Sequence, residues 1–293
     1  MKIHPRVAAL LAVLLWSSGA LFVLGLGRLP PYLLLALSTS VGLGVAVIFL
    51  TAANRWKHLM PYRKFMLPAG LLLIINQIGY VLAFRWAPAA QVDLVYYLWP
   101  SMLILLTSSF SGSYTTYLVI ASGAGGIFLA FGPGVLEQGG LMGYIVAIIS
   151  SLSWVAYSLM MRKHKLPYDF LCINLGIGAP VYWALHFFLG EPTFAVTGLE
   201  MGLLFLYGGG VFTVSYLLWG RAVTLGSVSE ASALSYLIPL LSVSGLCIFG
   251  YAQFTFRIAM ATVLVLLAAA TPMLVAWRSK TFYRFKDKVE AKA

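Results

Sequence analysis

Residues 93–100 read DLVYYLWP, and residues 232–239 read SALSYLIP. Aligned, the two stretches share tyrosine, leucine and proline in order, as Tyr97 and Tyr236, Leu98 and Leu237, and Pro100 and Pro239. These pairs are 139 residues apart, and Trp16 and Trp154 recur at 138 residues, a difference that one loop insertion explains. We interpret the matches as an internal repeat. The alternative is chance recurrence in an apolar composition.

The composition indicates a membrane protein. Hydrophobic residues make up 61% of the 293 residues and charged residues 9%, whereas soluble domains carry about 25% charged residues. So few charged side chains cannot cover a soluble globule of this size. The net charge is +11, but the charges lie between apolar runs, so no nucleic-acid partner is expected. Cys172 and Cys247 lie inside apolar segments and fit neither a disulfide framework nor a metal-ligand spacing.

Ten apolar segments are long enough to cross a bilayer as helices, which takes about 20 residues each. They are residues 7–27, 31–52, 66–86, 90–110, 114–132, 141–161, 169–189, 200–219, 228–249 and 254–277. Prolines and glycines mark the short joins between them, as in the run from Gly132 to Gly134. We therefore predict an all-α polytopic membrane protein with ten transmembrane helices and no soluble domain.

The basic residues predict the orientation of these helices. With the amino terminus inside, 16 of the 19 Lys and Arg residues lie in cytoplasmic segments, and only Arg28, Arg85 and Arg257 lie outside. This asymmetry satisfies the positive-inside rule, and the inverted orientation violates it. We expect both termini in the cytoplasm, and a first helix that is retained rather than cleaved as a signal peptide. The basic, aromatic tail after residue 277 is expected to lie on anionic lipid.

The repeat and the helix count together predict an inverted architecture. Residues 1–137 and 138–293 each hold five of the predicted helices, the second half ending in the short basic tail. Because five is odd, the second half enters the membrane from the opposite side, and an axis in the membrane plane relates the halves. Inverted repeats are typical of secondary transporters, whose substrate site lies near the midplane between them.

Proline, aromatic and amide residues at membrane depth are the candidate site. Pro100 and Pro239 fall about ten residues into their helices and are the predicted hinges, since each removes a backbone donor; the alternative is a packing kink. The predicted substrate-binding residues are Trp16, Asn76, Gln77, Tyr80, Tyr97, Trp99, Trp154, Tyr157, Tyr216 and Tyr236. Amides are costly in hydrocarbon, so we expect Asn76 or Gln77 to face a wet cavity, unless they only join helices.

Charged side chains are absent from the middle of the predicted helices. Asp93 is the nearest exception, and its position near the start of the fourth segment favours a carboxylate stabilised by the helix dipole. Without buried cations, the site is poorly suited to phosphates or sugar nucleotides. Without a carboxylate in the first helix, it lacks the usual trap for lipophilic cations.

The segment layout, with Tyr97-Leu98-Trp99-Pro100-Ser101 and Leu15-Trp16-Ser17, resembles the drug/metabolite transporter superfamily in its ten-helix form of two EamA-type repeats. The fourth segment is most similar to YddG-type aromatic amino acid exporters of bacterial inner membranes. This resemblance implies alternating access and a central cavity formed by helices one, three, four, six, eight and nine. It also implies an acidic residue in the third helix, where this chain has Gln77.

From these observations we expect a monomeric secondary carrier that exports aromatic and other large apolar amino acids across the inner membrane. We expect it to be no enzyme and to use no cofactor or metal, because its four histidines are scattered and no nucleophile has a base in view. No charge ring or carbonyl filter indicates a channel. The main alternative is a drug/metabolite carrier of the same fold for another small uncharged or zwitterionic substrate.

Overall fold

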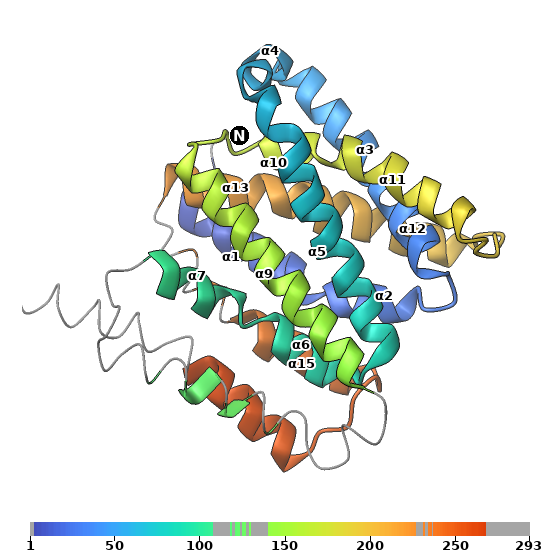
Figure 1. Ribbon diagram of the computed structural model, residues 1–293, viewed down its shortest axis with the longest axis vertical. Helices are drawn as coiled ribbons and strands as arrows, with labels where there is room; N and C mark the ends of the chain where they lie inside the picture. The colour runs from blue at the N-terminus through green and yellow to red at the C-terminus, as the bar shows by residue number, and fades with distance from the viewer. Residues whose placement is uncertain are drawn as a thin grey trace, which may run out of the picture.

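The computed structural model describes residues 3–107, 140–226 and 237–267, with isolated residues 118, 121–123, 125–126, 129, 231 and 234–235 between these ranges. Within them, all regular structure is helical. The predicted span 114–132 and Tyr236 lie outside the described ranges, apart from the isolated residues. The helices pack into one bundle, with the amino-terminal end near one extremity of α1 (Figure 1).

Six helical segments are long and apolar enough to cross a membrane, and two shorter apolar helices follow them in the described residues. The first half contains α1 (Pro5–Ser17), α2 (Gly19–Gly25), α3 (Pro31–Ala52), α4 (Trp56–Leu59), a 3-10 turn η1 (Met60–Phe65), α5 (Met66–Trp86), α6 (Ala89–Tyr96) and α7 (Trp99–Thr107). The second contains α9 (Leu141–Lys163), α10 (Phe170–Ile173), α11 (Leu175–Phe188), α12 (Gly198–Phe205), a π-helix η2 (Leu206–Val214), α13 (Ser215–Leu225), α15 (Leu237–Ile248) and the helix Phe256–Leu267.

The first predicted segment divides into α1 and α2 and the seventh into α10 and α11, and two more, the fourth and the eighth, are interrupted as well. The fourth divides into α6 and α7, and the eighth runs through α12, η2 and α13 as one apolar segment whose middle is a π-helix. The second and third predicted segments, in contrast, coincide with α3 and α5. Irregular helix geometry at membrane depth is tolerated where neighbouring protein surrounds it, and the interruptions of the fourth and eighth segments lie at the centre of the bundle.

Helices from the two halves alternate in the packing. α5 lies along α9, α3 along α11, and α1 along α13, as Figure 1 shows for the first two pairs. α6 also contacts α15, and α9 contacts both α6 and α7. The core is therefore built between the halves.

Small residues allow the closest of these approaches. A Cβ atom at Gly42 of α3 would lie 2.7 Å from the carbonyl oxygen of Gly208 in η2. Thr213 donates its hydroxyl to the Gly42 carbonyl at 2.7 Å, which ties the π-helix to α3. Glycines at helix contacts are the usual means by which membrane helices approach backbone to backbone.

The outer surface of the bundle is apolar. Large side chains such as Ile48 and Phe188, which are 70% and 87% exposed, lie on it. Exposed apolar surface on this scale is rare in soluble monomers. Together with the spans, it is consistent with a polytopic membrane protein.

Candidate functional site

The centre of the bundle holds a small cavity, about 50 Å³ in volume. It is lined by Trp16, Gly19, Asn76, Gln77, Tyr80, Tyr96, Tyr97, Trp99, Trp154, Tyr207, Val211, Phe212 and Tyr216. Most of these side chains are aromatic and none carries a charge. The volume has room for one or two water molecules, whose share of liquid is about 30 Å³ each.

Eight of the ten predicted binding residues line this cavity: Trp16, Asn76, Gln77, Tyr80, Tyr97, Trp99, Trp154 and Tyr216. Tyr157 does not line it. Its ring stacks on Trp154, with centroids 5.7 Å apart, and its hydroxyl accepts a hydrogen bond from Asn174 at 3.2 Å. Tyr236 lies outside the described residues.

Four tryptophans form a cluster beside the cavity, which we call the tryptophan partition: Trp16, Trp99, Trp154 and Trp219. Trp16 contacts the other three with ring centroids 5.0 to 6.3 Å apart, and Trp99 contacts Trp154 and Trp219 at 6.1 and 5.6 Å. Most of these contacts are edge to face. Such geometry adds roughly 0.5–1.5 kcal/mol per pair beyond the buried area, so the four rings stabilise one another.

A larger vestibule of about 560 Å³ lies on the other side of the partition. Trp154 and Trp219 form its inner end, and its mouth carries Arg55, Arg162 and Lys165. Its volume falls within the usual range of small-molecule pockets, about 300–1,000 Å³. The vestibule is thus large enough for an amino acid, whereas the central cavity must widen before it can hold one.

Gln77 is held in one orientation by two tyrosines. The Tyr182 hydroxyl donates to Gln77 Oε1 at 2.6 Å, and Gln77 Nε2 donates to the Tyr216 hydroxyl at 3.3 Å. These bonds join α5 to α11 and α13. Gln77 therefore makes the interhelical bonds of one predicted alternative and also lines the cavity; that this cavity is wet stays a prediction.

Asn76 likewise lines the cavity and joins neighbouring helices. Its Nδ2 donates to the Ser150 carbonyl at 2.9 Å and to the Tyr96 hydroxyl at 3.2 Å. Ser150 Oγ returns a bond to the Asn76 carbonyl at 2.6 Å. These reciprocal bonds join α5 to α9. They are stabilising because a polar group without a partner is costly in an apolar interior.

The two predicted hinge prolines stand at helix starts. The break in the fourth segment covers Tyr97 and Leu98, and Pro100 is the second residue of α7. Pro239 is the third residue of α15. Proline is well tolerated in a first turn, where its missing N–H has no intrahelical partner. Pro100 thus directly follows the break in its segment, and both prolines lie in the first turn of a helix; their role as hinges stays a prediction.

Tyr207, Phe212 and Tyr182 complete the site and were not among the predicted residues. Tyr207 and Phe212 lie five residues apart in η2, with ring centroids 4.6 Å apart. In an ordinary helix, a spacing of five places side chains on different faces, so only a π-helix explains their common orientation. The run Gly208-Gly209-Gly210 lies inside this π-helix and was the sequence feature that could have drawn attention to the segment. π-Helical turns are frequent at functional sites.

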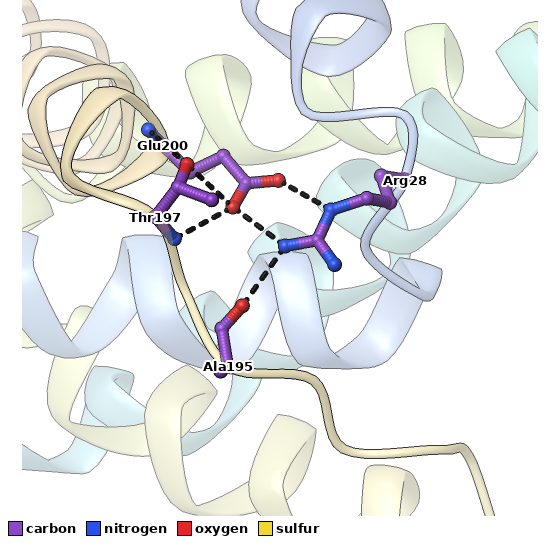
Figure 2. Close-up of polar contacts among 4 residues, drawn as sticks. All are labelled: Arg28, Ala195, Thr197 and Glu200. Atoms are coloured by element: carbon purple, nitrogen blue, oxygen red, sulfur yellow. Dashed lines mark hydrogen bonds and ion pairs between the residues drawn. The ribbon is translucent and has the colours of Figure 1, made fainter.

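Two ion pairs join the halves at opposite ends of α3, which is about 33 Å long at 1.5 Å per residue. Figure 2 shows the first, in which the Arg28 guanidinium holds Glu200 through two bonds of 2.8 and 2.7 Å and donates to the Ala195 carbonyl at 2.9 Å. Thr197 and Glu200 also form a capping box at the start of α12. The bond to Glu200 raises the pKa of Arg28.

Arg55 forms the second ion pair with Asp169, Nε to Oδ2 at 2.6 Å. The Asp169 side chain is fully buried, and the hydrogen bond to it raises the pKa of Arg55. In both ion pairs the arginine also lies over an aromatic ring: Arg28 over Phe194 and Arg55 over Tyr168. Each end of the bundle thus carries one arginine of the first half bound to a carboxylate and an aromatic ring of the second.

The expectation that Asp93 lies in the first turn of its helix, where the helix dipole would stabilise its carboxylate, is wrong. α6 begins at Ala89, so Asp93 lies beyond the first turn. Its side chain is completely buried. Ionisable side chains are therefore not confined to the ends of the segments, because one carboxyl group lies in the interior of the bundle.

The comparisons with known proteins agree with this picture. Residues 139–273 match the EamA-like transporter family. The aromatic amino acid exporter YddG of Ancylobacter novellus is 26% identical over 91% of this chain and 96% of its own length. YddG of Escherichia coli is 25% identical over 80% of this chain and 84% of its own length. A crystal structure with 26% identity matches 93% of this chain and 98% of its own, with a TM-score of 0.72.

Fold and comparisons together indicate a multi-pass membrane protein that is similar to EamA-like transporters, which points to a transporter rather than an enzyme. The predicted resemblance to the drug/metabolite transporter superfamily, and within it to YddG-type exporters, is confirmed.

Proposed function

We propose that the protein is a secondary carrier that exports aromatic and other large apolar amino acids by alternating access across the bacterial inner membrane. The observation that carries the proposal is the central cavity, which is lined by aromatic rings and two oriented amides and by no charged side chain. Such a lining favours a zwitterion with an apolar side chain. The names of the similar proteins support the same substrate class.

The cavity offers partners for each part of such a substrate. The rings of Tyr80, Tyr207 and Phe212 form an apolar wall for its side chain. Gln77, Asn76 and the tyrosine hydroxyls can exchange their internal bonds for bonds to the ammonium and carboxylate groups. Aromatic faces also attract an ammonium group through cation–π contacts.

Alternating access requires movable elements around this cavity. The break at Tyr97 and Leu98 lies between α6 and α7, and η2 interrupts the eighth segment beside it. Rotation at these breaks widens the cavity from its present 50 Å³. The vestibule then supplies substrate once the tryptophan partition opens, and its basic mouth attracts the carboxylate.

The packing supports two inverted five-helix halves, residues 1–137 and 138–293. The proposed repeat relates α1 to α9 and α5 to α13, so the contact of α1 with α13 and that of α9 with α5 are equivalent to each other, and α3 meets its own equivalent, α11. The vestibule mouth carries arginines and lysines of the segments assigned to the cytoplasm. With both termini on that side, the vestibule opens inward and the Arg28–Glu200 pair lies outward.

The test is exchange in liposomes that contain the purified protein. Preloaded phenylalanine, tryptophan or methionine should accelerate uptake of labelled phenylalanine. If none of the three exchanges or competes, the substrate claim is wrong. Exchange of another uncharged or zwitterionic compound in that case identifies a carrier of the same fold for a different metabolite.

A further inference from the structure

The vestibule combines an apolar inner end with a basic mouth. Trp154 and Trp219 form the inner end, and each is 3% exposed. Arg162 and Lys165 lie at the mouth and are exposed. Trp154 and Arg162 both belong to α9 and are eight residues apart, about 12 Å along the helix axis at 1.5 Å per residue. A ligand with an apolar ring at one end and a negative group at the other therefore finds a partner for each.

The two cations at the mouth have no acidic partner. Arg55 also lines the vestibule, but its charge is matched by Asp169, whose Oδ2 accepts a bond from Arg55 Nε at 2.6 Å. Arg162 and Lys165 form no ion pair within the described part of the chain. Among the described residues, no acidic side chain lines the vestibule. Its mouth thus carries two uncompensated positive charges, in contrast to the uncharged lining of the central cavity.

Lys165 has a backbone conformation that usually belongs to glycine. Its φ is 49°. Its N–H donates to the Arg162 carbonyl at 3.3 Å, and the Leu166 N–H donates to the Met161 carbonyl at 3.0 Å. These two bonds form a common cap at the end of a helix, in which glycine is preferred because a side chain is strained in the left-handed region. The lysine at this position favours a role for its side chain, which lines the vestibule.

We propose that the vestibule is a binding site for aromatic monocarboxylates that lack an ammonium group, and that such a ligand inhibits export. The inference rests on the proposed function and adds a regulation of the same path. These acids are what remains of an aromatic amino acid after its amino group is removed. The ring packs against Trp154 and Trp219, and the carboxylate lies between Arg162 and Lys165.

The charges explain why the ligand is an acid and not an amino acid. The ammonium group of a zwitterion finds no acidic partner among the described vestibule residues, and the two cations repel it. An acid without that group gains the same attraction for its carboxylate and is not repelled. The vestibule therefore binds net anions more tightly than zwitterions.

The same charges explain why the ligand inhibits and is not carried. Beyond the tryptophan partition, the central cavity offers no cation to a carboxylate that has left Arg162 and Lys165. Entry of an unpaired charge into an apolar interior is costly. The acid consequently stays in front of Trp154 and Trp219. There it occupies the path of the substrate and stabilises the conformation in which the partition is closed.

The first experiment measures binding by calorimetry, with the purified protein in nanodiscs of zwitterionic lipid. The probes are 3-phenylpropanoate, phenethylamine and phenethyl alcohol, which share the ring and differ in charge. We expect the acid to bind about tenfold more tightly than the amine or the alcohol, a difference of about 1.4 kcal/mol. Added sodium chloride should weaken binding of the acid only, because salt screens the exposed charges at the mouth.

Lys165→Gly and Asn54→Gly form a matched pair of variants. Asn54 has a φ of 51° and the same cap, with bonds from Asn54 N–H to Thr51 and from Arg55 N–H to Leu50, but it does not line the vestibule. Neither variant should lower the Tm, because glycine adopts positive φ without strain. Binding of 3-phenylpropanoate should weaken about fivefold in Lys165→Gly, the upper end for an exposed pair, and stay unchanged in Asn54→Gly.

The second experiment measures exchange of labelled phenylalanine in liposomes. Added 3-phenylpropanoate should inhibit exchange by the wild type, and preloaded 3-phenylpropanoate should not accelerate uptake. Each variant is compared with its own uninhibited rate. Half-inhibition of Lys165→Gly should then need about fivefold more acid, in line with the weaker binding.

Every other outcome has a defined meaning. Equal binding of the amine and the acid, or unchanged affinity in Lys165→Gly, overturns the inference. Acceleration of uptake by preloaded acid also overturns it, because the acid is then a substrate. Binding of dodecanoate without binding of 3-phenylpropanoate assigns the vestibule to lipid chains and overturns it too. Wild type that binds the acid but exchanges no amino acid refutes the proposed function and leaves the binding site in place.

Discussion

Gln77 donates a hydrogen bond of 3.3 Å to the hydroxyl of Tyr216, and the two residues are 139 positions apart in the chain. This is the separation at which the tyrosine, leucine and proline of residues 97–100 recur at 236–239. Trp16 and Trp154, paired at 138 positions, also meet, with ring centroids 5.5 Å apart. Residues at equivalent positions contact each other only when they lie near the axis that relates two halves. Both contacts therefore favour the proposed inverted repeat, which remains a proposal.

Gln77→Leu, which replaces the amide by an apolar side chain of similar size, should destabilise the protein. The substitution leaves the hydroxyls of Tyr182 and Tyr216 without their partner in a buried place. Each buried unsatisfied group costs about 1–3 kcal/mol. We expect a lower Tm by fluorescence-detected size exclusion after heating. Tyr182→Phe, which removes one bond and leaves only the amide oxygen unpaired, should lower the Tm less. An unchanged Tm in Gln77→Leu would exclude a structural role for the amide.

Trp99→Ala should reduce phenylalanine exchange about tenfold, which corresponds to about 1.4 kcal/mol. Trp99 is 1% exposed and contacts Trp16, Trp154 and Trp219. Its loss opens the partition and removes a wall of the cavity. The exchange rate of the milder Trp99→Phe variant should lie between those of the wild type and Trp99→Ala. The measurement is the initial rate of labelled exchange, normalised to folded protein.

Trp183→Ala is the matched control for that variant. Trp183 stacks on Phe187 and donates to Ser40 at 3.0 Å, away from the cavity. Its exchange rate should stay within about twofold of the wild type, a change of about 0.4 kcal/mol. Equal losses in both tryptophan variants would mean that the effect is one of folding, and the site would have to be sought elsewhere.

Arg55→Gln should destabilise the protein more than Arg28→Gln. Asp169 is completely buried, so loss of Arg55 leaves a carboxylate without a counter-charge. We expect a cost of about 2 kcal/mol, below the full range for buried pairs because Arg55 is 27% exposed. Arg28 is 49% exposed, and exposed pairs contribute little. Thermal unfolding of both variants in the same detergent shows which substitution lowers the Tm more. A larger decrease for Arg28→Gln would contradict the prediction that the Arg55–Asp169 pair contributes more to stability.

Gly42→Ala should destabilise the contact between α3 and η2 by about 1–3 kcal/mol, the usual range for overpacking. The new Cβ atom would lie 2.7 Å from the Gly208 carbonyl oxygen and 3.1 Å from Thr213 Oγ1. Gly44→Ala, two residues along the same helix, is the control, since a Cβ there meets nothing within 4 Å. It should be neutral or raise the Tm slightly because alanine favours a helix over glycine. Similar Tm values for the two variants would contradict the close approach.

Local patterns were sufficient for the helices and for most of the cavity lining. The bounds of α3 and α5 follow from hydropathy and from the prolines before them, because a helix in lipid must satisfy its own backbone. Tyr97 and Trp99 stood out because polar aromatic residues at membrane depth need partners. They line the cavity together with Trp16 and Trp154. Tyr157 lines the vestibule and not the central cavity, and its depth in α9 gave no information about that direction.

The amino-acid sequence by itself determined the apolar, helical character of the chain, the spans now seen in α3, α5 and α9, and the aromatic residues available at their depth. These properties are local, since composition and periodicity act over a few turns of chain. Tertiary structure alone decided that Gln77 meets Tyr182 and Tyr216, that a π-helix turns Tyr207 and Phe212 to one side, and that Asp93 is buried without a counter-charge. Each depends on the packing of helices distant in the chain, because burial and hydrogen-bond partners are set by neighbours in space.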